Sequence, residues 1–256
     1  LFVFGFLPWF FVLYATGAQN LPLSKFAIYS IGSSLFYTSL VGLIISTAGP
    51  LVGVSRPLSP KTIGPVLALS LLVLWFLTPS RDHESVVAVP DITSREVLPV
   101  ILLSVPLALG SLGVAIAPLS ALQIPILILL FGVVLGILFV ISDRVHKKTY
   151  PFVVFILALA IFYHTSLIGN YVWGWDIQLT YANITYIRET GRWTAAVQNF
   201  RNPLLILMLV PAMFANLTGA SVDLFFKMGM PLLAALIPVW IYWIAREFLN
   251  TKRSAL

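Results

Sequence analysis

Cysteine is absent from this chain of 256 residues, and charged residues are scarce. Without cysteine, the chain can form neither a disulfide nor a thiolate metal site. Only 9% of its residues are charged, whereas about a quarter are charged in an ordinary soluble domain. So few charges could not cover the surface of a soluble fold, and the composition therefore excludes that class of protein.

The few charges are mostly basic, with fifteen Lys and Arg against nine Asp and Glu and a net charge of +6. Proteins that bind nucleic acid gather their cations on one face or along one helix. In this chain the cations lie between apolar blocks, as they do in loops that join membrane helices. We therefore expect the lipid bilayer as a partner and no nucleic acid.

Hydrophobic residues make up 59% of the chain and form blocks about as long as a helix needs to cross roughly 30 Å of hydrocarbon. The blocks show no alternation of polar and apolar residues, which excludes the strands of a membrane barrel. The sequence therefore predicts an all-α fold, a polytopic bundle of transmembrane helices. The expected apolar blocks are residues 1–15, 26–47, 62–77, 97–117, 124–142, 151–168, 203–217 and 224–245.

Leu1 lies within the first apolar block, and neither Met nor a basic segment precedes it. We therefore expect a truncated helix and not a signal peptide, and the equally abrupt C-terminus indicates a piece of a longer protein. Residues 1–150 are predicted to be an N-terminal extension of about five spans, the first of them truncated. Residues 151–256 are predicted to begin a second module with a spanning helix.

One loop carries Arg144, Lys147 and Lys148, offset only by Asp143. Basic loops stay in the cytoplasm, so we expect loop 169–202 on the exoplasmic side of the plasma membrane.

Residues 203–217 would reach only about 22 Å as a helix, which is short for a span. We expect residues 203–218 to form an exoplasmic surface helix or a re-entrant helix. Residues 224–246 then span the membrane inward and place Arg246 in the cytoplasm, as basic residues prefer.

Small residues in two blocks are interpreted as packing positions. Gly32, which two serines follow, and Gly110 with Gly113 would let neighbouring helices approach closely. Pro106 and Pro238 lie inside blocks, where a membrane helix tolerates a kink.

Loop 169–202 holds three of the seven tryptophans, Trp173, Trp175 and Trp193. Tryptophan prefers the headgroup level, where the ring is half solvated and the indole N–H finds a partner. Anchoring to the membrane surface is the simplest interpretation of these residues.

Asp176 begins a predicted juxtamembrane helix that runs to about Thr190 along the membrane surface. The expected polar face carries Asp176, Thr180 and Asn183, and the adjoining apolar face carries Ile177, Tyr181 and Ile184. Asp176 either caps the helix by accepting N–H bonds or acts as a carboxylate that accepts a proton or binds a cation.

The segment with Asp176, Tyr181, Ala182 and the run Glu189-Thr190-Gly191-Arg192-Trp193 resembles the first exoplasmic loop of GT-C membrane glycosyltransferases. It is most similar to the protein mannosyltransferase and aminoarabinose transferase branch. Those proteins have an Asp after a membrane helix, a Tyr on a surface helix and then a Gly-x-Trp turn.

The following residues extend this resemblance. Asn202-Pro203-Leu204 and Gly219 look like the family's Pro-Leu surface helix, which ends in Gly. Residues 224–246 look like its next spanning helix, which closes with an Ala-Arg pair. The resemblance covers roughly residues 151–250.

Two further strings, His164-Thr165-Ser166-Leu167 and Gly174-Trp175-Asp176-Ile177, look like a family of archaeal proteins predicted to lie in membranes. In that family, extra helices precede a glycosyltransferase-like loop, as residues 1–150 do here.

The resemblance implies an enzyme that transfers a sugar from a polyprenyl-phosphate donor to an exoplasmic acceptor, either a protein or a glycolipid. The family's Asp corresponds to Asp176, which would activate the acceptor hydroxyl or help to hold a divalent cation, Mg²⁺ or Mn²⁺. On a continuous helix Glu189 lies about 20 Å from Asp176 and cannot share that ion. We therefore expect the partner ligand outside this chain.

Trp175, Tyr181, Arg192 and Lys227 are the expected substrate-binding residues. Lys227 stands where relatives often have Arg, and it either contacts the leaving phosphate or snorkels beside Asp223. Arg192, like Arg188 and Arg201, either takes that role or contacts headgroups.

Two other functions stay open, a transporter or flippase for a lipid-linked substrate and a non-catalytic membrane scaffold. A transporter is expected to place ionisable residues at mid-membrane, and these blocks have essentially none. The patterns Asn183-Ile184-Thr185 and Asn216-Leu217-Thr218 match the glycan acceptor pattern, and we interpret both as chance matches because they lie in predicted helices.

Overall fold

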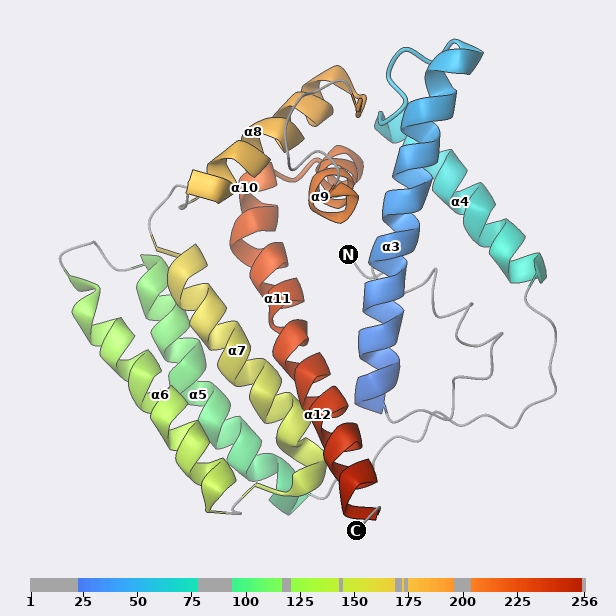
Figure 1. Ribbon diagram of the computed structural model, residues 1–256. Coiled ribbons are helices and arrows are strands. Elements are labelled where there is room, and N and C mark those ends of the chain that lie inside the picture. The colour runs from blue at the N-terminus through green and yellow to red at the C-terminus, as the bar shows by residue number, and fades with distance from the viewer. Residues whose placement is uncertain are drawn as a thin grey trace. The chain divides into compact units, whose positions relative to one another are not determined.

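The computed structural model describes residues 23–77, 94–116, 121–142, 145–168, 172, 175–195 and 204–254 (Figure 1). The described residues form helices and no strand, and they include six helices long and apolar enough to cross a membrane. The prediction of an all-α polytopic membrane fold is therefore confirmed, and the chain is an integral multi-pass membrane protein.

The candidate spans follow the expected apolar blocks. They contain α3 (Leu23–Ala48), α4 (Pro60–Leu77), α5 (Ser94–Ile116), α6 (Gln123–Ile141), α7 (Tyr150–Ser166) and a last run of α10 (Val222–Leu224), η5 (Phe225–Gly229), α11 (Met230–Ala234) and α12 (Leu236–Ser254). Helices form here because a chain in hydrocarbon must pair its backbone N–H and C=O groups within the segment. The block at residues 1–15 lies outside the described residues.

The outer surface of the spans is apolar. On α6, Pro125, Leu129, Gly132 and Gly136 are buried at intervals of three or four residues, whereas Phe131 on the other side is 64% exposed. In water, a large apolar patch of this kind is a site of aggregation. In the hydrocarbon core of a bilayer, exposed apolar side chains do not cause aggregation, so we infer that this side of α6 faces lipid.

The chain folds as two compact units, each made of two stretches of sequence. The first unit comprises Leu1–Val89 and Gly174–Phe225, and the second comprises Pro90–Trp173 and Phe226–Leu256. Packing therefore divides the chain differently from the predicted modules, residues 1–150 and 151–256. The predicted division into residues 1–150 and 151–256 rests on family resemblance, and it stays a prediction.

In the second unit, α5 packs against α6 and α7, while α11 and α12 pack against α7. A Cβ at Gly110 would lie 2.7 Å from Leu129 Cβ and 2.9 Å from the Leu129 backbone. At Gly113 a Cβ would lie 2.6 Å from Pro125. The prediction that these two glycines let helices approach closely is confirmed.

Gly32 does not have this role, because a Cβ there would meet nothing within 4 Å. The prediction of close packing for the run Gly32-Ser33-Ser34 is therefore wrong at Gly32, whereas Ser34 in the same run is fully buried. On α3 the close approach lies at Gly42, where a Cβ would be 2.6 Å from Met213 Sδ of α9 (Leu205–Thr218). Both neighbours of Gly42, Met213 and Leu209, belong to α9, so this glycine lets α9 approach α3.

In the first unit, α9 is the central helix. It packs against α3, α4 and α8 (Trp175–Thr190), and its residues from Met208 to Met213 are buried without interruption. In Figure 1, α9 is seen nearly end-on beside the lengthwise α3, so the two helices cross steeply. The buried part is the middle of α9, since Leu204 and Ile206 at its start are 50% and 42% exposed. The prediction of a surface or re-entrant helix stays open.

The connection between α3 and α4, residues 49–59, contacts the ends of both α8 and α9. It begins with the short helix η2 (Gly49–Val52). Leu58 N–H donates to the Gly191 carbonyl at 2.7 Å, and the Leu58 carbonyl accepts from Asn216 Nδ2 at 2.6 Å. Because one residue contacts both helix ends, α8 and α9 end on the side of the membrane where the α3–α4 connection lies.

The order of the spans agrees with this shared side. Among the residues that the structure describes between the α3–α4 connection and α8, four segments are candidate spans: Pro60–Leu77, Leu98–Ile116, Gln123–Ile141 and Lys147–Ser166. An even number of crossings returns the chain to the side from which it started.

Replacing Gly110 by Ala should destabilise the protein, because the new Cβ meets the Leu129 backbone and cannot be accommodated by turning a side chain. We expect a loss of about 1–3 kcal/mol, measured as a lower thermal unfolding midpoint in detergent. Gly32→Ala is the matched control, since it adds the same methyl group where there is space. Equal midpoints for the two variants would show that α5 and α6 do not meet at Gly110.

Candidate functional site

α8 is the helix predicted from Asp176 to Thr190, and its observed bounds are Trp175–Thr190. It ends at Gly191, whose φ of +67° lies in the left-handed region that glycine adopts without steric cost. Gly191 N–H donates to the Ile187 carbonyl at 2.9 Å and closes the last turn. The glycine of the Gly-x-Trp turn therefore ends this helix.

The buried side of α8 differs from the predicted faces. Thr180, Ile184 and Ile187 are buried, whereas Ile177 is 40% exposed. The assignment of Thr180 to the polar face and of Ile177 to the apolar face is therefore wrong. Tertiary packing explains the difference, because α9 packs against α8. A threonine can be buried at such a contact when its hydroxyl has a hydrogen-bond partner.

Trp175 and Asp176 lie in the first turn of α8. Their side chains lie outside the described residues, as do Trp173 and Arg201. The two alternatives for Asp176, a helix cap or a proton-accepting and cation-binding carboxylate, both stay predictions.

Tyr181 is half-buried on α8, and its hydroxyl donates to Asp223 Oδ2 at 3.5 Å. Asp223 lies in the first turn of α10, which Ser221 caps by accepting from Leu224 N–H at 3.2 Å. The structure thus brings a second carboxylate to the helix that begins with Asp176.

Sequence reasoning placed Asp223 only beside Lys227 and missed its contact with Tyr181. The two residues are 42 positions apart, and no periodic pattern relates them. The one available signal was an acidic residue in the first turn of the last apolar block.

Arg192 is exposed in the turn after α8, where its N–H donates to Thr190 Oγ1 at 3.4 Å. Trp193 N–H donates to Ser46 Oγ at 3.5 Å, and the indole nitrogen of Trp193 is buried. The side chain of Trp193 is half-buried, as expected for a ring at the headgroup level, but its indole N–H has no hydrogen-bond partner among the described residues, so that part of the prediction is wrong. Its role as a membrane anchor stays a prediction. The indole nitrogen is enclosed because the turn after α8 folds back onto α3, where the Trp193 backbone meets Ser46.

Lys227 belongs to the second unit and lies half-buried in η5, a π-helical turn. Such a turn shifts the hydrogen-bond ladder of the helix, and nearby carbonyls need other donors. Two hydroxyls of α7 supply them: Ser166 Oγ donates to the Lys227 carbonyl at 3.1 Å, and the Tyr163 hydroxyl donates to the Met228 carbonyl at 3.2 Å. The two predicted roles of Lys227, phosphate contact and snorkelling, stay open.

The two glycan-acceptor asparagines have inward-facing amides. Asn216 Nδ2 donates to the Leu58 carbonyl at 2.6 Å, and Asn183 Nδ2 is buried. A glycan attached to either nitrogen would have to displace protein, so neither pattern marks an accessible acceptor.

Among the described residues, no three His, Asp or Glu side chains gather as the ligands of a metal ion would. Glu189 is exposed at the opposite end of α8 from Asp176. The divalent cation, Mg²⁺ or Mn²⁺, and the partner ligand for Asp176 both stay predictions.

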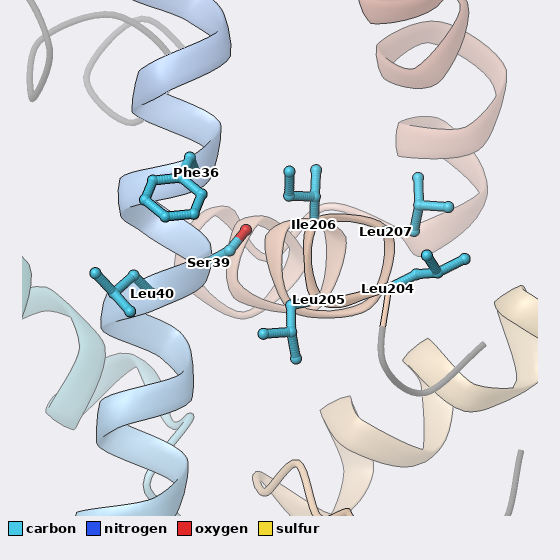
Figure 2. Close-up of a pocket in the computed structure, with 7 residues that line it drawn as sticks. All are labelled: Phe36, Ser39, Leu40, Leu204, Leu205, Ile206 and Leu207. Atoms are coloured by element: carbon cyan, nitrogen blue, oxygen red, sulfur yellow. The ribbon is translucent and has the colours of Figure 1, made fainter. Parts of the chain in front are cut away.

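A cavity of about 500 Å³ lies between α3 and the start of α9. Figure 2 shows its lining, in which side chains of α3 lie beside those of the first residues of α9. The lining residues are Phe36, Ser39, Leu40, Leu204, Leu205, Ile206 and Leu207. Ser39 Oγ donates to the Leu35 carbonyl of its own helix at 2.8 Å. An apolar lining whose hydroxyl is already paired fits a hydrocarbon ligand.

No family model, curated protein or solved structure matches this chain. The likeness to GT-C glycosyltransferases therefore rests on the residues that carry it, and it stays a prediction.

Cysteine labelling can test the membrane sides, because the native chain has no cysteine. Val52→Cys and Ala195→Cys place thiols at exposed positions in the first unit, and Lys148→Cys places one in the basic loop. On intact cells, an impermeant maleimide should label positions 52 and 195, and position 148 only after permeabilisation. Labelling of 52 and 195 from opposite sides would contradict their shared side, and labelling of 148 alone would invert the orientation.

The Tyr181–Asp223 contact should appear as an energetic coupling. We expect Tyr181→Phe and Asp223→Asn together to cost about 1 kcal/mol less than the sum of the single changes, because either one removes the same hydrogen bond. Thermal unfolding of the four proteins measures this coupling. Additive effects would show that the hydroxyl and the carboxylate do not interact in the membrane.

Proposed function

We propose that this chain is the N-terminal part of a GT-C type membrane glycosyltransferase. It transfers a sugar from a polyprenyl-phosphate donor to an acceptor, a protein or a glycolipid, on the exoplasmic side of the membrane. The N-terminal helices form an extension, and the segment around α8 and α9 forms the catalytic loop.

The order of the elements carries this proposal. After a spanning helix come α8 with Tyr181, a glycine that ends it at Gly191, and then α9, which ends at Gly219 with φ +71°. The last span contains the Ala245-Arg246 pair within α12. The ends of α8 and α9 at glycines support the proposal, whereas α12 continues to Ser254 and does not end at the Ala245-Arg246 pair.

Glycosyl transfer needs a carboxylate near the attacking oxygen, a positive charge near the leaving phosphate and an apolar path for the prenyl chain. Asp176 in the first turn of α8 supplies the carboxylate. Arg192 lies beyond the opposite end of α8 from Asp176, about 24 Å away along the helix, so we assign the charge to Lys227 on the resemblance alone. The cavity between α3 and α9 supports the third requirement, because it suits a hydrocarbon chain.

In the proposed reaction, the acceptor hydroxyl oxygen bonds to the anomeric carbon of the sugar. The bond from that carbon to the phosphate oxygen breaks, and polyprenyl phosphate leaves with the electron pair. Asp176 accepts the proton of the acceptor hydroxyl. Tyr181, one turn and a half further along α8, contacts substrate together with Trp175.

A transporter or flippase is a weaker proposal. Transporters place ionisable residues near the membrane midplane. In the described candidate spans the Asp, Glu, Lys and Arg residues lie near the span ends instead: Lys25, Lys61, Lys147, Lys148, Asp223, Lys227, Arg246 and Glu247. A scaffold without catalysis would use Asp176 only as a cap of α8.

Asp176→Asn in the full-length protein should lower sugar transfer from a polyprenyl-phosphate donor by at least about 100-fold, because the amide keeps the size of the carboxylate but accepts no proton. Transfer is measured with a radiolabelled donor in membranes that contain equal amounts of each protein.

Glu189→Gln is the matched control, since it neutralises an exposed carboxylate at the other end of the same helix. It should keep transfer within about twofold of the native rate. Full activity of Asp176→Asn would remove this residue from the mechanism, and equal losses in both variants would point to charge and not to position.

A further inference from the structure

The last turn of α8 needs hydrogen-bond donors from outside the helix. A helix leaves its last four carbonyls without partners of its own. Gly191 N–H satisfies the Ile187 carbonyl, and the α3–α4 connection supplies two further donors. Arg56 Nη2 donates to the Glu189 carbonyl at 2.7 Å, and Leu58 N–H donates to the Gly191 carbonyl at 2.7 Å.

Arg56 suits this end of α8 for two reasons. Its guanidinium is positive and lies at the negative end of the helix dipole. It also packs directly on Gly191, where an added Cβ would lie 2.9 Å from Arg56 Cβ and 3.1 Å from Nε. The end of α8 is therefore held by charge, by a hydrogen bond and by close contact at one position.

Leu58 connects this contact to the rest of the first unit. Its side chain is fully buried, and its backbone contacts the end of α8 through N–H and the end of α9 through the carbonyl. Asn216, the donor on α9, lies one turn before the glycine that ends that helix. A segment of the N-terminal extension thus joins the ends of both helices of the proposed catalytic loop.

The middle of α8 is held differently. Thr180, Ile184 and Ile187 form one buried stripe, and a helix packed along a single stripe can turn about its axis unless another contact stops it. Tyr181 makes one such contact with Asp223 at 3.5 Å. Arg56 and Leu58 make two shorter ones, of 2.7 Å each, at the C-terminal end. The rotation they oppose is the one that would move the Tyr181 hydroxyl away from Asp223.

We propose that the α3–α4 connection, residues 49–59, is a clamp that sets the rotation of α8, with Arg56 as its positioning residue. The functional part of this inference rests on the proposed glycosyltransferase activity, because α8 carries the residues assigned to it. The N-terminal extension then has a defined task, which is to hold the proposed catalytic helix in register. Arg56 touches no reacting atom and acts through α8.

Cysteine reactivity in the full-length protein, with any cysteine outside residues 1–256 replaced by serine, tests the clamp without any assay of activity. Thr180→Cys places a reporter thiol on the buried stripe of α8, and Ala212→Cys places one in the interior of α9, where the native side chains are 7% and 0% exposed. In the Arg56→Ala background, a soluble maleimide should label Thr180→Cys about tenfold faster, because a charge-assisted hydrogen bond is lost. Ala212→Cys should stay protected.

Lys61→Ala is the matched control, because it removes a positive charge from an exposed residue at the start of α4. It should leave both labelling rates unchanged. Unchanged labelling of Thr180→Cys in Arg56→Ala overturns the clamp. Faster labelling of both reporters also overturns it, since that result shows general unfolding and not rotation of α8.

Arg56→Gln keeps an N–H donor without the charge, so its labelling rate should lie between those of the native protein and Arg56→Ala. This variant replaces Arg56→Ala if the alanine protein does not fold. The order native, Gln, Ala supports the clamp, and any other order contradicts it.

Sugar transfer by the same variants separates the two proposals. Arg56→Ala should lower kcat about tenfold, with the KM for the donor changed less than about twofold, because misplacement of α8 affects the attack more than donor binding. Arg56→Gln should restore part of that kcat. If the native protein transfers no sugar, the proposed function fails while the labelling result still decides the clamp. If transfer is native-like in Arg56→Ala despite faster labelling, the clamp has no catalytic role.

Discussion

Pairing of backbone N–H and C=O groups is the constraint on which the rest of this structure depends. In a bilayer no water is available for an unpaired group, so each carbonyl must find a donor in the protein. Inside the long helices each carbonyl is paired with the N–H four residues later in the same helix. At helix ends and at the π-helical turn this pairing is incomplete, and those are the places where distant segments meet. Leu58 at Gly191 and Ser166 at Lys227 are both solutions to the same problem.

These contacts also position the proposed chemistry. α8 and α9 lack the length of a span, and their ends are kept on one side of the membrane by the α3–α4 connection. The glycines that end the two helices have positive φ, and at Gly191 the missing side chain lets Arg56 approach. The proposed catalytic loop is therefore built on a segment from the N-terminal extension, and the activity we propose for the loop gives that extension a purpose.

Predictions from the sequence were accurate where local physics decides the outcome. The spans, the bounds of α8 and the close packing at Gly110 follow from apolar length, helix-ending residues and small side chains. Predictions failed where the burial of a residue depends on which other helix packs against it. Gly32 has no neighbour within 4 Å, Thr180 is buried on α8, and the indole N–H of Trp193 is buried without a hydrogen-bond partner among the described residues. The sequence pattern could not show which of these surfaces α9 and α3 cover.

By itself, the sequence determined that this is an all-α membrane protein. Each apolar block must satisfy its own backbone, and only a helix of about twenty residues does so across a bilayer. Tertiary structure alone decided that Arg56 meets Glu189 across 133 residues and that Tyr181 meets Asp223 across 42. A helical pattern relates residues three or four apart, so it holds no information on which ends come together. Those pairings depend on how α9 fits among its neighbours.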